Sequence, residues 1–207
     1  MPFVTFEGVE GSGKSTQLKL AAARLRGTGR PVLATREPGG TRIGRILRGA
    51  LLPSAHRELD SVAEWLLFEA DRRQHVVEVL RPALEKGRFV LCDRFSDATE
   101  AYQLVGRRLD ARLVRRVDAL ARDGLVPDLT LLYDLDPGAG LSRANRRGGR
   151  SVGRFERTEL EFHEKVRRAY LVIARREPER VRVLDASRPV EELFRDTWRA
   201  LAGRFTV

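Results

Sequence analysis

The feature that most constrains the fold is the glycine-rich segment from Gly8 to Ser15, which reads Gly-Val-Glu-Gly-Ser-Gly-Lys-Ser. It fits the pattern G-x-x-x-x-G-K-[ST], a loop whose backbone N–H groups surround the phosphates of a nucleotide. The β-prone run Phe3–Phe6 precedes it and a helical pattern starting at Lys14 follows it, which is the context that the motif requires. A solvated glycine turn is the weaker alternative. The segment therefore predicts binding of a nucleoside triphosphate.

Single residues of this phosphate loop have expected roles. Glycines let the backbone approach an anion, and the start of a helix presents unpaired N–H groups to it. Lys14 is placed to reach the β- and γ-phosphates, and the Ser15 hydroxyl to ligate Mg²⁺. The predicted ATP-binding set is Gly8, Val9, Glu10, Gly11, Ser12, Gly13, Lys14, Ser15 and Thr16.

Composition limits the class of protein. A chain of 207 residues with 42% apolar and 33% charged residues is typical of a soluble globular domain. No run approaches the roughly 20 apolar residues of a membrane span, and no signal peptide opens the chain. Cys92 is the only cysteine, so we expect a buried thiol in a cytoplasmic protein with no membrane partner.

The net charge of +10 at pH 7 raises nucleic acid as a partner. The basic residues are spread along the chain and do not alternate with aromatic residues, as a single-strand binding surface would need. A phosphate-rich small substrate explains the charge at least as well, and we expect no nucleic-acid partner. A nucleic-acid-dependent ATPase is the competing hypothesis, and it predicts ATP hydrolysis stimulated by DNA or RNA.

Five apolar runs alternate with helical patterns and predict one α/β domain, 1–207, with a parallel sheet. The expected strands are Phe3–Phe6, Pro31–Ala34, Arg88–Cys92, Leu129–Leu135 and Val181–Leu184. The expected helices start at Lys14 or cover Ile43–Leu51, Leu59–Lys86, Ser96–Gln103, Leu109–Arg122, Glu159–Arg176 and Val190–Leu201. Pro82 is expected to kink or break the helix Leu59–Lys86. We predict a P-loop NTPase-type five-stranded sheet flanked by helices.

Two segments at expected strand ends carry candidate chemistry, because ligands of open α/β sheets bind at the carboxyl ends of strands. Arg36 and Glu37 are either an exposed ion pair or, as we favour, part of a shaped loop with Pro-Gly-Gly after them. In Asp93-Arg94, the acid can serve a metal ion and the arginine can hold a transferred phosphate. His56 and His75 lack metal-ligand spacing and are interpreted as solvated surface residues.

Arginine and glycine are concentrated between residues 143 and 154. A charge run is usually a solvated face. Glycine hinges and clustered arginines opposite a phosphate loop instead favour a mobile cover, or LID, over the transferring phosphoryl group. The arginines of this segment are Arg143, Arg146, Arg147, Arg150 and Arg154.

Together these segments resemble bacterial thymidylate kinase (dTMP kinase), a family of P-loop nucleoside-monophosphate kinases, over essentially the full chain. The combination of Arg-Glu-Pro-Gly-Gly-Thr with Asp-Arg and Ala-Tyr-Gln is specific to that family. The matching blocks are Phe6–Gln17, Thr35–Thr41, Asp93–Phe95, Ala101–Gln103 and Pro127–Thr130. The resemblance implies Mg²⁺-dependent transfer of the ATP γ-phosphoryl group to dTMP, giving dTDP and ADP for dTTP biosynthesis. It also implies a homodimer formed through long helices such as Leu59–Lys86. Another P-loop deoxynucleoside or nucleoside-monophosphate kinase is the alternative.

The resemblance also implies roles in binding the acceptor. Glu10 would contact the sugar 3′-hydroxyl or the metal shell. Phe68, which by periodicity alone is a core residue, would stack on thymine, and Arg72 would hydrogen-bond its O4. Thr99 would meet the N3 edge, arginines would hold the phosphate, and a proline would wall the methyl pocket. The implied dTMP-binding set is Glu10, Arg36, Pro38, Arg48, Phe68, Arg72, Arg94, Thr99, Tyr102 and Gln103.

The source of catalytic charge follows from a family subgroup. The loop of this chain has no arginine between Glu10 and Lys14, whereas the loop of one family subgroup has one there. In the other subgroup the cover supplies the catalytic arginine. We therefore expect the cover of this chain to supply it, with Arg143 and Arg154 as further candidates. The predicted catalytic set is Lys14, Arg94, Arg147 and Arg150, and the predicted metal ligands are Ser15 and Asp93. Phe95 stands where the family usually has Tyr or His, and Ala98 where it often has Ser, which bears on acceptor selectivity.

Overall fold

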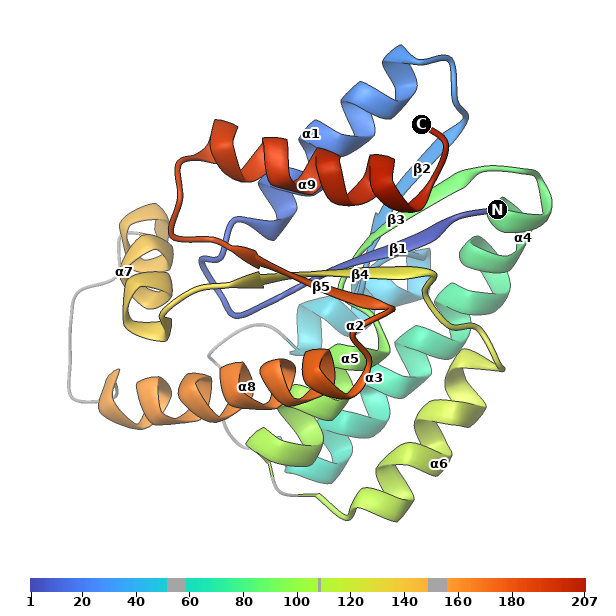
Figure 1. Cartoon of the computed structure of the whole chain (residues 1–207). Coiled ribbons are helices and arrows are strands. Elements are labelled where there is room, and N and C mark those ends of the chain that lie inside the picture. The colour runs from blue at the N-terminus through green and yellow to red at the C-terminus, as the bar shows by residue number, and fades with distance from the viewer. Residues whose placement is uncertain (52–58, 108, 149–155) are drawn as a thin grey trace.

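A five-stranded sheet forms the core, with all strands parallel in the order β2-β3-β1-β4-β5 (Figure 1). The computed structural model describes residues 1–51, 59–107, 109–148 and 156–207. β1 and β4 are buried along almost their whole length, as expected for parallel strands covered on both faces. The strands are β1 Phe3–Glu7, β2 Val32–Arg36, β3 Phe89–Asp93, β4 Leu129–Asp134 and β5 Val181–Asp185. The predicted parallel sheet is confirmed.

Helices cover both faces of this sheet. In Figure 1, α1 and α9 lie together on one side, and α3, α6 and α8 lie on the other. No helix within the described ranges combines the length and the hydropathy needed to cross a membrane. The α-helices are α1 Lys14–Gly27, α2 Arg42–Leu51, α3 Ser61–His75, α4 Arg81–Glu85, α5 Ser96–Thr99, α6 Ala111–Arg122, α7 Pro137–Gly148, α8 Glu156–Arg176 and α9 Val190–Arg204, and the π-helical segments are η1 Val76–Leu80 and η2 Glu100–Gly106.

The strand order places the candidate segments side by side. β1 lies between β3 and β4, and β3 also pairs with β2. Because the strands are parallel, the loops after β1, β2 and β3 emerge at one edge, where the strand order reverses direction. The phosphate loop, the segment 36–41 and the segment 93–95 therefore meet at this edge.

The region predicted as the helix Leu59–Lys86 contains three consecutive helical segments without a break, and the middle one is π-helical. α3 continues into η1 and then into α4. Pro82 lies in the first turn of α4, where its missing N–H cannot donate to a preceding carbonyl. The Arg81 N–H reaches back five residues to the Val76 carbonyl. The break expected at Pro82 thus takes the form of a wider π-helical turn before the proline.

Two features differ from the prediction in ways that bear on the site. β2 extends to Arg36, because Thr35 and Arg36 pair in register with β3. The helix α7 was not predicted, because its glycines obscure the helical pattern, and it includes residues 143–148 of the expected cover. The rest of the cover, 149–154, lies outside the described residues.

Candidate active site

The phosphate loop connects β1 to α1 with three glycines at positive φ, namely 141° at Gly8, 75° at Gly11 and 85° at Gly13. A Cβ at Gly8 would lie 2.5 Å from the Tyr133 carbonyl oxygen, and one at Gly11 would lie 2.1 Å from the Gly140 carbonyl oxygen. Only glycine fits such contacts. All nine residues of the predicted ATP-binding set lie in this loop and the first turn of α1, where N–H groups favour an anion.

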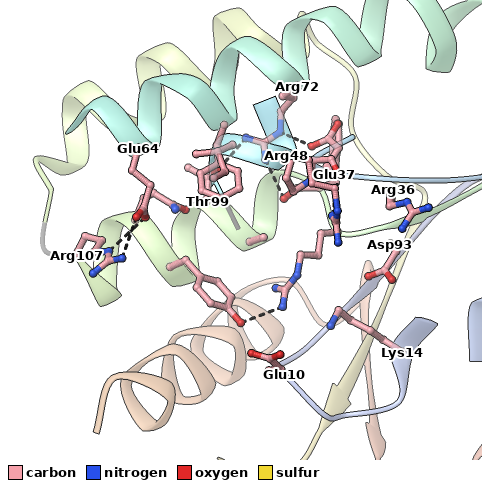
Figure 2. Close-up of a pocket in the computed structure, with 18 of the residues that line it drawn as sticks. Glu10, Lys14, Arg36, Glu37, Arg48, Glu64, Arg72, Asp93, Thr99 and Arg107 are labelled. Carbon is pink, nitrogen blue, oxygen red and sulfur yellow. Dashed lines mark hydrogen bonds and ion pairs between the residues drawn. The ribbon is translucent and has the colours of Figure 1, made fainter. Parts of the chain in front are cut away.

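A cavity of about 440 Å³ opens beside the loop (Figure 2). Its walls come from the loops after β1, β2 and β3 and from α2, α3, η2 and α8. The cavity is lined by the whole implied dTMP-binding set: Glu10, Arg36, Pro38, Arg48, Phe68, Arg72, Arg94, Thr99, Tyr102 and Gln103. Lys14, Ser15 and Asp93 line it as well. The fold thus brings the predicted acceptor, donor and metal residues into one cavity.

Ser15 and Asp93 are in direct contact. The Ser15 hydroxyl donates to Asp93 Oδ2, and Asp93 ends β3 beside β1. Both supply hard oxygen ligands, which Mg²⁺ prefers. Within the described residues, no cluster of three or more His, Cys, Asp or Glu side chains could hold a metal ion alone. The donor set suits an Mg²⁺ ion that shares its ligands with substrate phosphates and water.

Arg72 is the centre of a buried polar network. Its Nε donates to Glu37 Oε2 at 3.0 Å, and its Nη1 donates to Thr99 Oγ1 at 2.7 Å (Figure 2). Nη1 also lies 2.8 Å from Glu69 Oε1 and 3.1 Å from Asp118 Oδ1. Burial alone would lower the pKa of Arg72, but these carboxylates, Glu69 first, raise it above its ordinary value. The guanidinium is therefore charged and fixed in orientation at the cavity wall.

The interpretation of His75 as a solvated residue is wrong. Its side chain is fully buried, with Nδ1 2.9 Å from Glu37 Oε1 and Nε2 2.8 Å from Thr35 Oγ1. A Cβ at Gly40 would lie 2.3 Å from this ring, so the imidazole supports the loop after β2. His75 is buried because a buried carboxylate and a hydroxyl satisfy both of its nitrogens. His56 lies outside the described residues.

Glu37 is 5% exposed, so it is not the exposed ion-pair partner of Arg36. It instead joins Arg72 to His75. The loop after β2 is further held by α3, where Asp71 Oδ1 accepts the Gly39 N–H at 3.1 Å. Burial raises the pKa of Asp71 to about 6. The loop is thus shaped by buried polar contacts from one face of α3.

Arg94 and Lys14 present positive charge at the end of the cavity near the phosphate loop. Arg94 donates to the Tyr102 hydroxyl at 3.0 Å and to the Tyr170 hydroxyl at 3.2 Å. No carboxylate of the described chain forms an ion pair with Arg94. Burial and the charge of Arg94 lower the pKa of Lys14 to about 8. Two cations that face each other without a direct counter-ion favour a bound anion such as phosphate.

Phe95 and Ala98 are the two positions for which the resemblance implied a departure from the family pattern. The Phe95 ring is 1% exposed and packs edge-on against Phe3 with centroids 5.0 Å apart. The polar contact of this residue comes from its backbone, because the Phe95 carbonyl accepts a hydrogen bond from Arg72 Nη2 at 3.2 Å. Ala98 is half-buried and lines the cavity next to Thr99. The ring at position 95 therefore replaces a polar side chain by an apolar contact.

Glu7 is a site residue that the sequence analysis did not select. It is fully buried at the end of β1, where Oε1 accepts the Phe95 N–H and Oε2 the Tyr170 hydroxyl, both at 2.7 Å. Burial raises the pKa of Glu7 to about 7, although the charge of Arg94 opposes the shift. The available signal was an acid directly before the phosphate loop. Glu7 connects the loop, the segment after β3 and α8.

We expect Glu7→Gln to remove part of the pH dependence of stability. The folded pKa, about 7, lies above the ordinary value of 4.5. Glu7 therefore contributes stability that is fully present below the unfolded pKa and is lost as pH rises through the folded one. At about 1.4 kcal/mol per pKa unit, the wild type should lose about 3 kcal/mol relative to Glu7→Gln across this window. Urea unfolding of both proteins at about pH 4 and about pH 8 measures the difference, and parallel pH profiles would contradict it.

Five residues that line the cavity were not selected as site residues from sequence: Leu51, Glu64, Arg107, Phe162 and His163. Arg107 Nη2 donates to Glu64 Oε2 at 2.9 Å, and Figure 2 shows this pair at the end of the cavity away from Lys14. Phe162 and His163 come from α8. The apolar pattern of α8 predicts a helix but does not tell which of its side chains faces the cavity.

The cover arginines are only partly described. Arg147 lies in the last turn of α7, and Arg150 and Arg154 lie outside the described residues. Arg143 Nη1 donates to the Ala186 carbonyl at 3.0 Å, which directs part of its guanidinium to the loop after β5. The assignment of catalytic charge to Arg147 and Arg150 stays a prediction.

Comparisons with known proteins agree with this arrangement. Residues 6–197 match the family model described as thymidylate kinase. The chain belongs to the thymidylate kinase family. It is 49% identical over 201 residues to the thymidylate kinase of Solidesulfovibrio magneticus, covering 95% of this chain and 96% of that one. It is 50% identical over 202 residues to that of Deinococcus radiodurans, covering 98% and 97%.

A solved structure supports the same conclusion. The thymidylate kinase from Ehrlichia chaffeensis superposes with a TM-score of 0.79 at 32% identity, covering 97% of this chain and 98% of that one. The predicted family and fold are confirmed, and the chain is a phosphotransferase, an ATP-dependent dTMP kinase. The roles of single cavity residues stay predictions.

Proposed function

We propose that this chain transfers the γ-phosphoryl group of ATP to the 5′-phosphate of dTMP, giving dTDP and ADP, through the cavity residues assigned above. One observation carries this proposal. A single cavity joins a buried Arg72–Thr99 pair, suited to a nucleobase edge, to Lys14 and Arg94, suited to phosphates, directly beside the phosphate loop. An acceptor nucleotide with its phosphate toward the donor fits this distribution of groups.

Recognition of thymine rests on Arg72 and the aromatic wall. Arg72 is fixed by Glu37 and presents only hydrogen-bond donors, as a guanidinium must. It would therefore donate to a carbonyl oxygen such as thymine O4 and disfavour the amino group that cytosine carries at the same position. Phe68, half-buried on α3, would stack on the ring, with Pro38 beside the methyl group.

The acceptor phosphate would be held by Arg36, Arg48 and Arg94. Burial and the neighbouring charge of Arg36 lower the pKa of Arg48, and a bound anion would relieve that repulsion. Arg48 is oriented by the Pro38 carbonyl, to which Nη1 donates at 2.9 Å. The attacking group is already a phosphate oxygen, so no strong general base is needed. Positioning and charge neutralisation by Lys14 and Arg94 would supply catalysis.

We propose that Mg²⁺ is held by Ser15 and Asp93 together with ATP. Ser15 and Asp93 would hold the ion, which would supply positive charge against the phosphates of ATP. The contact between the Ser15 hydroxyl and the Asp93 carboxylate supports this assignment, because it sets two oxygen ligands at the end of the phosphate loop. Within the chain, the hydrogen bond keeps both groups oriented toward the cavity.

An acceptor panel tests the proposal. The purified chain, ATP and Mg²⁺ are assayed with dTMP, dUMP, dGMP, CMP and thymidine. We expect the highest kcat/KM for dTMP and no transfer to thymidine. For dUMP, which lacks one methyl group, kcat/KM should be lower than for dTMP by about 10–200-fold. A preference for another acceptor would support a different P-loop kinase. ATP hydrolysis stimulated by DNA or RNA would instead support a nucleic-acid-dependent ATPase.

We also propose a homodimer formed through α2 and α3. Large apolar side chains on these helices are exposed: Ile43 42%, Ile46 62%, Val62 43% and Leu66 47%. Exposed apolar side chains on two helices that pack together favour an interface between copies. Leu66→Arg would place two unpaired charges in a two-fold interface, so we expect the dissociation constant to rise by at least about 10²-fold. Sedimentation equilibrium measures it, with Leu120→Arg on α6, where Leu120 is 73% exposed, as the control. Equal effects of both variants would contradict this interface.

The chain is further proposed to be one domain, 1–207, located in the cytoplasm, without a nucleic-acid or membrane partner. The only cysteine supports a reducing location, because Cys92 is fully buried in β3 as a free thiol. This position also fits the expectation of a small buried side chain.

A further inference from the structure

His163 on α8 is buried without a complete set of partners. His163 is 7% exposed, and it lines the cavity. Its Nδ1 has no hydrogen-bond partner among the described residues. Buried polar groups are almost always paired, and an exception calls for an explanation. Nδ1 is enclosed by protein atoms, whereas Nε2 is not enclosed and has no hydrogen-bond partner among the described residues. A ligand in the cavity can therefore reach the ring at Nε2.

The position of His163 indicates which part of the acceptor it meets. It lines the same cavity as Glu10, Lys14 and Arg94, and after burial the charges of these three residues are what shifts its pKa. Figure 2 shows the side chain of Glu10, which belongs to the phosphate loop, on the side of the cavity near α8. The base end of the cavity belongs to Arg72 and the phosphate end to Lys14, which leaves the sugar for the region between Glu10 and His163.

The ring is fixed and neutral. Tyr102 and Phe162 pack against it edge-on, with centroids 6.4 Å and 5.5 Å from that of His163. Burial lowers the pKa of His163 below its ordinary value of 6.5, so the imidazole is uncharged at neutral pH. A neutral imidazole has one N–H donor and one acceptor nitrogen.

We propose that His163 is a specificity-determining residue that binds the sugar 3′-hydroxyl of the acceptor together with Glu10, an inference that rests on the proposed function. A hydroxyl group can donate one hydrogen bond and accept others. The Glu10 carboxylate can only accept, and the neutral imidazole can donate. The hydroxyl would donate to Glu10 and accept from the His163 N–H, so the two side chains would recognise it from opposite walls.

The test compares two acceptors and two enzymes. His163→Phe keeps an aromatic ring against Tyr102 and Phe162 but cannot donate a hydrogen bond. We expect kcat/KM for dTMP to fall about tenfold, the effect of one hydrogen bond, mainly through a higher KM. For 2′,3′-dideoxythymidine monophosphate, which lacks the 3′-hydroxyl, kcat/KM should not change, and neither should the KM for ATP. His163→Asn, which retains an N–H donor, should restore part of the preference for dTMP.

Controls separate this role from packing. Glu164→Gln changes the next residue on α8, whose side chain is exposed, and should leave both acceptors unaffected. An equal loss for the two acceptors would assign His163 to packing and overturn the proposal, as would no loss for either. A wild type that does not phosphorylate dTMP refutes the proposed function itself. A wild type that uses dTMP but does not distinguish it from the 3′-deoxy acceptor refutes only the sugar contact.

Discussion

Replacing Lys14 with methionine is expected to lower kcat by about 10²–10³-fold, the cost of removing one preorganised charge or donor at a transferring group. Lys14 begins α1 and lines the cavity beside Arg94, and its ammonium is placed to reach the β- and γ-phosphates. Methionine keeps an unbranched apolar stem at this half-buried position, so the fold should persist. Steady-state kinetics measures the loss, and urea unfolding verifies the fold.

The matched control for this variant is Lys19→Met. Lys19 lies on the same helix with an exposed side chain, so it removes the same charge from α1 without touching the cavity. We expect its kcat to equal that of the wild type. Near-normal turnover in Lys14→Met would refute the assignment of the phosphate loop, whereas an equal loss in both variants would indicate a general effect of charge.

Removing both Arg147 and Arg150 is expected to lower kcat by about 10³–10⁵-fold, the range for an arginine that stabilises a transferring phosphoryl group. The phosphate loop has no arginine of its own between Glu10 and Lys14, so this charge must come from elsewhere. The KM for dTMP should change much less, because the interaction would be made mainly in the transition state. Single alanine variants would show which arginine carries the effect.

Arg146→Ala is the control for the cover. Arg146 is exposed on α7, and its Nε hydrogen-bonds the Ser142 carbonyl at 3.4 Å within the same helix. We expect wild-type turnover for this variant. Should alanine at Arg143, Arg147, Arg150 and Arg154 together leave kcat unchanged, the cover would not be the source of catalytic charge.

The buried network around Arg72 explains why the cavity walls are preorganised. Arg72 contacts carboxylates from the loop after β2, from α3 and from α6. Breaking one such buried pair leaves an uncompensated charge, which typically costs 3–5 kcal/mol of stability. The network therefore couples the orientation of the base-binding side chains to the stability of the fold. The proposed substitutions avoid it, so that effects on turnover can be separated from effects on folding.

The sequence by itself determined the architecture and most of the candidate site. The central strands β1, β3 and β4 are buried on both faces and appear as continuous apolar runs. The partly exposed edge strands β2 and β5 were also predicted close to their observed bounds, from short apolar runs. The phosphate loop predicts nucleotide binding from sequence alone, because its glycines and Lys14 act through local backbone geometry. The segments after β2 and β3 were located because parallel strands bring their carboxyl ends to one edge. Local patterns were sufficient for each of these conclusions.

Only the tertiary structure decided which polar side chains are buried and whom they contact. Glu7 meets Tyr170 from 163 residues away, and Glu37 meets Arg72 from 35 residues away. His75 was interpreted as a surface residue because its partners, Thr35 and Glu37, lie in β2 and directly after it. The sequence analysis did not select His163. The cost or gain of burying a polar group depends on the partner that it finds. Such partners lie far apart in the chain, and no local pattern carries that information.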